Sequence, residues 1–150
     1  MRRAIDLAIE NARSGRGGPF GAVVIRDQQI IAEGVNEVTE SKDPTAHAEI
    51  VAIRNAARVL NSFDLSGCEM YASCEPCPMC LGACYWARVA VIHFGCTASD
   101  ASNSGFDDSW IYREISQPHP ARKISMRQIM RDEALAAFRA WEASPYKTPY

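Results

Sequence analysis

The stretch Asp43-Pro44-Thr45-Ala46-His47-Ala48-Glu49, taken with Cys74-Glu75-Pro76-Cys77-Pro78-Met79-Cys80, decides the fold of this chain. The two stretches lie about thirty residues apart, which is roughly the length of one helix, a connector and one strand. A compact α/β unit can therefore bring them face to face. Both stretches contain side chains that bind metal ions, so we expect the rest of the chain to hold them together.

The spacing of apolar residues predicts the elements around these two stretches. Helices are expected at 2–14, where Ile5, Ala8, Ile9 and Ala12 recur at helical spacing, at 43–60 and at 78–88. Strand-like runs lie at 20–26, 29–35, 68–73 and 89–95, and the first two form a hairpin through Asp27-Gln28. A strand, a helix and a further strand after residue 68 predict a parallel pair with a right-handed crossover.

The C-terminal third is less regular. Residues 97–120 are rich in Ser, Asn, Asp and Gly and read as a long functional loop. A last edge strand is expected at 122–128 and a last helix at 132–141, followed by an extended tail. No repeat and no domain boundary is visible, so residues 1–150 are predicted to form a single domain.

Composition excludes several function classes. The 150 residues are 47% hydrophobic and carry a net charge of -2, as in an ordinary soluble protein. No cluster of Lys and Arg marks a nucleic-acid surface, and no apolar run is long enough to cross a bilayer. Because polar residues interrupt the apolar positions after Met1, no secretion signal is recognised and a cytoplasmic location is expected.

The chain has six cysteines, and five of them fall between Cys68 and Cys84. A chain with helical and strand periodicity throughout is unlike a small disulfide scaffold, so metal binding is favoured. Cys77 and Cys80 flank the start of a predicted helix, where the helix dipole favours thiolates. With His47 they supply three ligands and leave a fourth tetrahedral position for water, which is typical of a catalytic Zn²⁺ site with one ion per subunit.

Glu49 follows His47 by two residues, a rotation of roughly 200° on a regular helix. A base beside the metal-bound water is therefore a more natural role for it than a ligand. His-x-Glu followed by Pro-Cys-x-x-Cys is the signature of zinc deaminases that act on nucleobases, with the glutamate as general acid and base. Both halves of that signature are present here, as His47-Ala48-Glu49 and Pro76-Cys77-Pro78-Met79-Cys80.

Three other uses of these cysteines stay open at the level of sequence. Cys74, Cys77, Cys80 and Cys84 have the spacing of an iron-sulfur run. A closed structural zinc site would take Cys74 as the fourth ligand, which leaves Glu49 without a role. Cys77 and Cys80 alone would make a redox pair, which explains neither His47 nor Glu49. Catalytic zinc accounts for the most residues.

The chain resembles the cytidine-deaminase-like zinc hydrolases through three motifs: Gly18-Pro19-Phe20-Gly21-Ala22-Val23, Thr45-Ala46-His47-Ala48-Glu49, and the run from Cys74 to Ala83. It is similar, more narrowly, to the small bacterial guanine deaminases through Gly105-Phe106-Asp107-Asp108-Ser109, Ile111-Tyr112 and a final tyrosine. The resemblance implies an α/β/α sandwich around a mixed, largely parallel sheet of five strands. It also implies a homodimer that exchanges a C-terminal segment, about 97–150, and hydrolysis of guanine to xanthine and ammonia in purine catabolism or salvage.

The resemblance assigns roles to particular residues. It implies that His47, Cys77 and Cys80 hold zinc, that Glu49 moves protons, and that His47 also borders the substrate. Asn36 would hydrogen-bond the purine, Asp108 would relay a second proton, and Asp108 and Tyr150 would close the pocket.

Phe20 and Phe106 are candidates to stack on a flat substrate, although a single aromatic is more often a core residue. Two alternatives remain: deamination of a guanine nucleoside or of adenosine in transfer RNA, and a non-catalytic interaction module that zinc stabilises.

Overall fold

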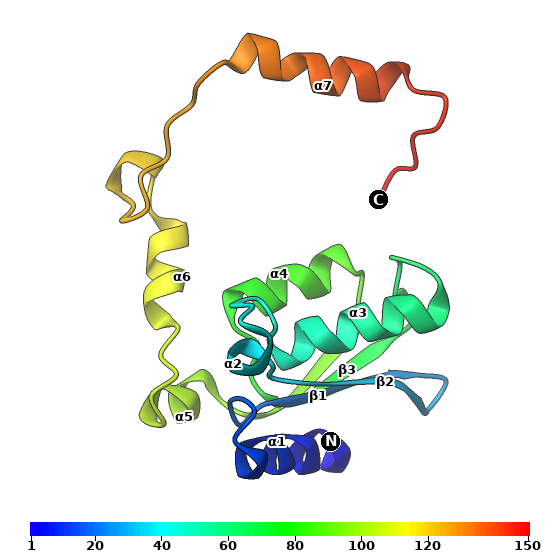
Figure 1. Cartoon of the computed structure of the whole chain (residues 1–150), viewed down its shortest axis with the longest axis vertical. Coiled ribbons are helices and arrows are strands. Elements are labelled where there is room, and N and C mark those ends of the chain that lie inside the picture. Colours follow the sequence, from blue (N-terminus) through cyan, green and yellow to red (C-terminus); the bar gives the residue numbers. More distant parts are fainter. The chain divides into compact units, whose positions relative to one another are not determined.

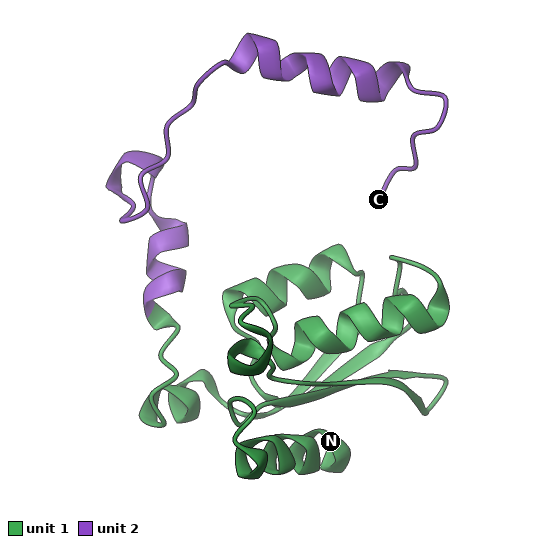
Figure 2. Cartoon of the chain, viewed as in Figure 1, with its two compact units in different colours: residues 1–109 green, residues 110–150 purple.

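The computed structural model describes residues 1–150 and divides them into two compact units, Met1–Ser109 and Trp110–Tyr150 (Figure 2). The first unit contains both metal-binding stretches and the whole sheet. The second contains helices joined by irregular segments.

The sheet of the first unit has four strands in the order β2-β1-β3-β4, with bounds Gly21–Arg26 (β1), Gln29–Val35 (β2), Glu69–Cys74 (β3) and Val91–Cys96 (β4) (Figure 1). The predicted hairpin is confirmed: Asp27 and Gln28 both take left-handed backbone angles, which suits the twist of a two-residue turn. The parallel pair is confirmed as β3 and β4.

Two features of the predicted sheet are wrong. It has four strands instead of five, because residues 122–128 form no strand and β4 remains an edge. It is also not largely parallel, since β1 runs antiparallel to both β2 and β3. The hairpin turns the chain from β1, inside the sheet, back into β2 at its edge, and β3 runs in the same direction as β2, so both neighbours of β1 are antiparallel to it.

Helices cover both faces of this sheet (Figure 1). Helix α1 (Arg2–Ser14) packs on one face, and α3 (Ala48–Leu60) and α4 (Pro78–Trp86) lie on the other, while α2 (Val38–Ser41) is a single turn between β2 and α3. The larger core cluster lies on the α3 and α4 side, and a smaller one forms where Ala4 and Leu7 meet Val23.

Helix α1 buries a different face from the one that its apolar spacing suggests. The buried residues are Ala4, Leu7, Ala8 and Asn11. Ile9 is 43% exposed, because it belongs to a second apolar face that points away from the sheet. This helix therefore presents an apolar surface that the first unit leaves uncovered.

The region from 97 to 120 is more ordered than its composition suggests. Thr97 and Asp100 form a capping box that starts α5 (Ala98–Asn103), and α6 (Ser109–Ser116) and a 3₁₀ turn (His119–Ala121) follow. The predicted last helix is confirmed as α7 (Arg131–Ala143). No residue after Ala87 is buried, so both β4 and the whole second unit consist of exposed or half-buried residues.

None of the helices combines the length and the apolar character that crossing a membrane would need.

The close approach of β2 to α3 requires a glycine. A Cβ added at Gly34 would collide with the carbonyl oxygen of Ala48 and the amide nitrogen of Ala52. We expect Gly34→Ala to destabilise the fold by about 1–3 kcal/mol, because the helix must shift to admit the methyl group. Urea denaturation checks this, with Gly82→Ala as the matched control, since a Cβ at Gly82 would meet nothing within 4 Å. Equal midpoints for the two variants would contradict the packing described here.

Candidate active site

His47 stands at the start of α3, one residue before the helix begins. Its backbone is extended, and the first helical residue is Ala48. The prediction that the helix starts at Asp43-Pro44 is wrong, because Asp43 instead closes a separate turn by accepting hydrogen bonds from the backbone nitrogen and the hydroxyl of Thr45. His47 is thus the N-cap residue, at the positive end of the helix dipole.

Cys77 occupies the same position on the second helix. It is the N-cap residue of α4, and Pro78 takes the first helical place, where a missing N–H costs nothing. Cys80 follows in the first turn and is fully buried. Two helix N-termini therefore meet at one point, on the side of the sheet that α3 and α4 cover.

The three predicted ligands lie together. The Nδ1 atom of His47 is 3.6 Å from the Sγ atom of Cys77 and 3.6 Å from the Sγ atom of Cys80. All three ligand atoms fall within 4.8 Å of one another. Zinc bonds of about 2.3 Å to sulfur and about 2.0 Å to nitrogen, set at a tetrahedral angle, place such atoms roughly 3.6 Å apart. The side chains therefore fit a zinc ion with little movement.

The electrostatics of the cluster agree with this use. A hydrogen bond from Cys80, helped by His47, lowers the pKa of the Cys77 thiol to about 4. The same bond, with burial, raises the pKa of Cys80, and the bond to Cys77 raises the pKa of His47. The two thiols thus share a proton, which a metal ion displaces when it binds.

Glu49 lies beside the ligands without belonging to them. Its side chain is buried, and its Oε2 atom is 3.4 Å from the Sγ atom of Cys80. Burial raises the pKa of this carboxyl group, as suits a group that must take up a proton and give it back. The predicted separation of roles, three ligands and one base, matches this arrangement.

The rival uses of cysteine fit the structure less well. The thiol of Cys74 points to the carbonyl oxygen of Thr97 at 3.5 Å and is not in the ligand cluster. The thiol of Cys84 is buried in the core against the sulfur of Met70. Neither can complete an iron-sulfur set or a closed zinc site without rearrangement, which leaves the cluster with three ligands.

Asn36 follows directly after β2 and is 7% exposed. Its Oδ1 atom accepts hydrogen bonds from the backbone nitrogens of Gly18 (3.2 Å) and Val38 (3.3 Å). Since backbone N–H groups only donate, these two bonds decide which end of the amide is oxygen. The Nδ2 amino group is left to donate elsewhere.

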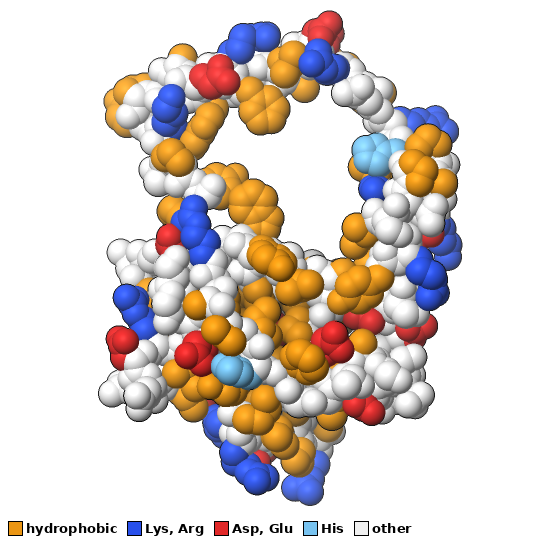
Figure 3. Space-filling model, turned by 180° about the vertical axis from the view of Figure 1, so that it is seen from behind, with side chains coloured by type: hydrophobic (Ala, Val, Ile, Leu, Met, Phe, Trp, Pro, Cys, Tyr) orange, Lys and Arg blue, Asp and Glu red, His pale blue; other side chains and the backbone are white.

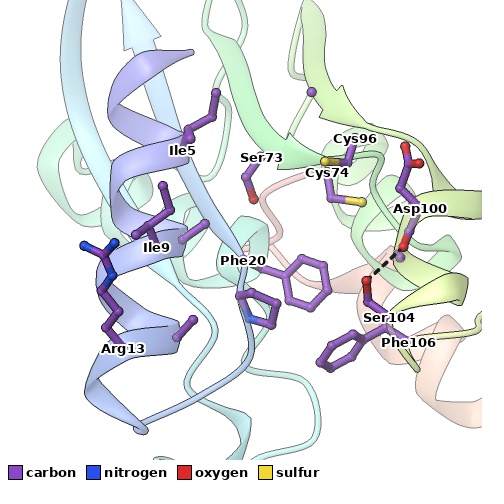
Figure 4. Close-up of a pocket in the computed structure, with 15 residues that line it drawn as sticks. Ile5, Ile9, Arg13, Phe20, Ser73, Cys74, Cys96, Asp100, Ser104 and Phe106 are labelled. Atoms are coloured by element: carbon purple, nitrogen blue, oxygen red, sulfur yellow. Dashed lines mark hydrogen bonds between the residues drawn. The ribbon is translucent and has the colours of Figure 1, made fainter.

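The predicted aromatic pair is also brought together. The rings of Phe20 and Phe106 meet edge to face, with centroids 4.9 Å apart. Both line an apolar groove of about 630 Å³ between α1 and α5, which Cys74 and Cys96 border from the sheet (Figure 4). The groove does not contain the metal ligands, so it is a separate feature from the active site.

Asp108 belongs to the first unit, and its surroundings connect it to the ligand cluster. Burial, followed by the negative charge of Cys77, raises its pKa. Asp108 in turn helps to raise the pKa of His47. Tyr150 belongs to the second unit, whereas the ligand cluster belongs to the first, so its predicted role in closing the pocket stays a prediction.

Sequence reasoning missed Asn11. This buried side chain of α1 donates to the backbone next to the active site, at Gly18 and Asn36. A polar residue in register with Ala4, Leu7 and Ala8 was the available signal, but the more hydrophobic Ile5 and Ile9 concealed it.

The ligand set can be tested by metal analysis. We expect Cys77→Ser and Cys80→Ser to lose the bound zinc, which amounts to about one ion per chain in the unaltered protein, because two ligands hold the ion poorly. Cys74→Ser is the control and should keep its zinc. Elemental analysis after gel filtration with a chelator gives the stoichiometry. Zinc lost from the Cys74 variant but kept by the other two would contradict the assignment.

Comparison with known proteins agrees with this geometry. The model of the cytidine and deoxycytidylate deaminase zinc-binding region matches residues 1–96. Guanine deaminase of Bacillus subtilis is 51% identical over 150 residues, covering 100% of this chain and 96% of that protein. Its X-ray structure superposes with a TM-score of 0.97 over 99% of this chain and 95% of that one.

More distant relatives share the fold. A structure described as guanine deaminase from Nitrosomonas europaea is 31% identical, with a TM-score of 0.67, over 95% of this chain and 82% of that one. A tRNA-specific adenosine deaminase of Aquifex aeolicus is 44% identical over 116 residues, covering 77% of this chain and 74% of that protein. With the ligand cluster and the buried glutamate in place, the chain belongs to the cytidine and deoxycytidylate deaminase zinc-binding family.

Proposed function

We propose that this chain is a zinc-dependent guanine deaminase, which hydrolyses guanine to xanthine and ammonia. The observation that carries the proposal is the buried carboxyl group of Glu49 beside a three-ligand cluster, in a chain that matches a guanine deaminase over its whole length. A zinc ion at the cluster would supply an activated water near neutral pH. The protein's own side chains would bind the purine and transfer the protons.

Glu49 moves the first proton. Its raised pKa lets it take a proton from the attacking water, whose oxygen bonds to C2 of guanine. Glu49 then passes that proton to a ring nitrogen next to C2. The carbon then carries both a hydroxyl and an amino group. Asp108, whose pKa is also raised, relays the hydroxyl proton to the amine. Ammonia leaves, and the C2 carbonyl of xanthine forms.

Recognition of the purine falls to Asn36. Because its Oδ1 atom is already occupied by two backbone N–H groups, only the amino group is offered to the substrate. A donor at this position favours a ring edge that presents acceptors. Guanine presents its 6-oxo oxygen and N7 next to each other, whereas adenine places an amino group there. The backbone of Phe20 contacts Asn36, since the carbonyl oxygen of Phe20 accepts a hydrogen bond from the backbone nitrogen of Asn36.

The alternatives are weaker on specific grounds. A zinc-stabilised interaction module has no use for a buried carboxyl group 3.4 Å from a ligand sulfur. The similarity to tRNA-specific adenosine deaminases is the one observation that supports an enzyme acting on transfer RNA. The net charge of -2 argues against it, because neutralising phosphates requires a basic surface.

The roles of zinc and Glu49 are tested together. We expect Glu49→Gln to keep its zinc and to lose turnover by a factor of roughly 10² to 10⁴, since only the proton transfer is removed. Ammonia release should be measured with guanine, guanosine, adenine, cytosine and adenosine side by side. Turnover of guanine alone by the unaltered protein supports the proposal. Preference for adenosine, or substantial activity of the Glu49 variant, would overturn it.

The second part of the proposal concerns assembly, namely a homodimer that exchanges its C-terminal segment. Three features support exchange. The outer edge of β4 is unpaired, and its strand residues are half-buried or exposed. The apolar groove on the α1 side is lined by Ile5, Ile9 and Phe106 (Figure 4). Hydrophobic side chains are gathered on the face of the first unit seen in Figure 3.

The second unit offers a matching surface. It has no buried residue, yet it carries many exposed apolar side chains: Trp110, Tyr112, Ile115, Ile124, Met126, Ile129, Met130, Phe138 and Trp141. So much apolar surface on a segment without a core of its own needs a partner. A second copy of the chain supplies one: its second unit would pack along the open edge of β4, and α7 would cover the groove. Tyr150 of one subunit would then close the active site of the other.

Mixing two inactive variants tests the exchange. Glu49→Gln and Tyr150→Ala should each lose activity as homodimers. When they are co-expressed, the mixed dimer regains one site with an intact Glu49 and the partner subunit's intact tyrosine. Random pairing makes half of the dimers mixed, so about a quarter of the unaltered activity should return. No recovery in a preparation shown by mass spectrometry to contain mixed dimers would overturn the exchange.

A further inference from the structure

A buried amide on α1 reaches the substrate side of the fold. Asn11 is polar but only 1% exposed, because it belongs to the face of the helix that packs on the sheet. Its Nδ2 atom donates to the carbonyl oxygen of Gly18 at 2.9 Å and to that of Asn36 at 2.8 Å. Both acceptors are carbonyls, so the orientation of this amide is determined. One helix residue thus ties together the loop before β1 and the residue after β2.

The cost of this arrangement indicates a purpose beyond packing. The Oδ1 atom of Asn11 is buried and accepts no hydrogen bond from another group of the protein. An unsatisfied buried acceptor destabilises a fold, and an apolar side chain here would avoid the cost. The two hydrogen bonds that its Nδ2 atom donates are what Asn11 offers and an apolar side chain would not.

Those contacts hold a substrate-binding group. The carbonyl of Asn36 accepts from Asn11, its backbone nitrogen donates to the carbonyl of Phe20 at 3.1 Å, and its Oδ1 atom accepts from the backbone of Gly18 at 3.2 Å. The backbone of Gly17 lies so close to the carbonyl of Asn36 that a Cβ there would collide with it. Every polar group of Asn36 except its Nδ2 amino group is therefore engaged within the chain.

We propose that Asn11 is a positioning residue that holds Asn36 with its amino group turned to the substrate. The inference rests on the proposed function, since it assumes that Asn36 binds the purine. Asn11 itself does not touch the substrate. It acts by fixing the peptide groups of Gly18 and Asn36, so that the Oδ1 atom of Asn36 stays bound to the backbone. Without Asn11 the peptide groups of Gly18 and Asn36 are held less tightly, which weakens the bond from the Gly18 backbone that orients the Asn36 amide.

Steady-state kinetics with guanine distinguish positioning from general stability. We expect Asn11→Ala to raise KM about tenfold, the equivalent of losing one well-placed hydrogen bond, and to change kcat by less than about twofold. Leu7→Ala is the matched control, because Leu7 is buried on the same face of α1 but contacts the core near Val23. It should lower stability and the yield of folded enzyme while leaving KM unchanged. A KM for Asn11→Ala equal to that of the control would overturn the proposal.

A double variant supplies the second readout. If Asn11 acts through Asn36, the KM of Asn11→Ala combined with Asn36→Ala should equal that of Asn36→Ala alone, because the group being positioned is already gone. Additive effects would show that Asn11 acts by another route and would overturn the inference. Bound zinc, measured for each variant, should be unchanged throughout.

A variant in the loop before β1 disturbs the same contact without altering α1. Gly17→Ala disturbs the same carbonyl of Asn36 from a half-buried loop and should also raise KM. Gly82→Ala is its control, because a Cβ at that position meets open space.

The outcomes separate the two proposals. If the unaltered enzyme does not turn over guanine, the proposed function fails. If it does turn over guanine, and both Asn11→Ala and Gly17→Ala leave KM unchanged, only the role of Asn11 fails.

Discussion

The convergence of two helix N-termini on one point is the constraint on which the rest of the structure depends. His47 and Cys77 occupy equivalent positions before α3 and α4, and their ligand atoms are 3.6 Å apart. A tetrahedral metal site tolerates little error in such distances. The sheet must therefore hold the two helices in register, and the glycine at position 34 lets α3 approach β2 closely enough to do so.

Within this frame the acid-base chemistry follows from burial. Glu49 is the second residue of α3, in its first turn, and its carboxyl group lies outside the cluster of His47, Cys77 and Cys80. It is held instead against the sulfur of Cys80, in a site where water is scarce and its proton is retained more tightly. Burial, followed by the negative charge of Cys77, likewise raises the pKa of Asp108. Two carboxyl groups with raised pKa values thus lie near the cluster, as the two proton transfers proposed above require.

The proposed substrate-binding residue, Asn36, depends on contacts from the other side of the sheet. The amide of Asn36 is held by the loop before β1 and by Asn11 on α1, which packs on the face away from the metal. A hydrogen-bond relay of this kind connects the stability of α1 to the shape of the pocket. It also explains why a polar residue persists on the buried face of an otherwise apolar helix, despite an unpaired oxygen.

The sequence by itself predicted the residues of the metal cluster, a carboxyl group beside it and most of the elements. His47, Glu49, Cys77 and Cys80 were predictable because metal chemistry restricts residue types and spacing, and the hairpin was predictable because only local backbone geometry is involved. The tertiary structure alone decided the rest. The missing fifth strand, the exposed β4 and the buried face of α1 depend on which surface packs against which, and local periodicity does not encode that choice. Asn11 and the orientation of Asn36 likewise arise from hydrogen bonds between residues far apart in the chain.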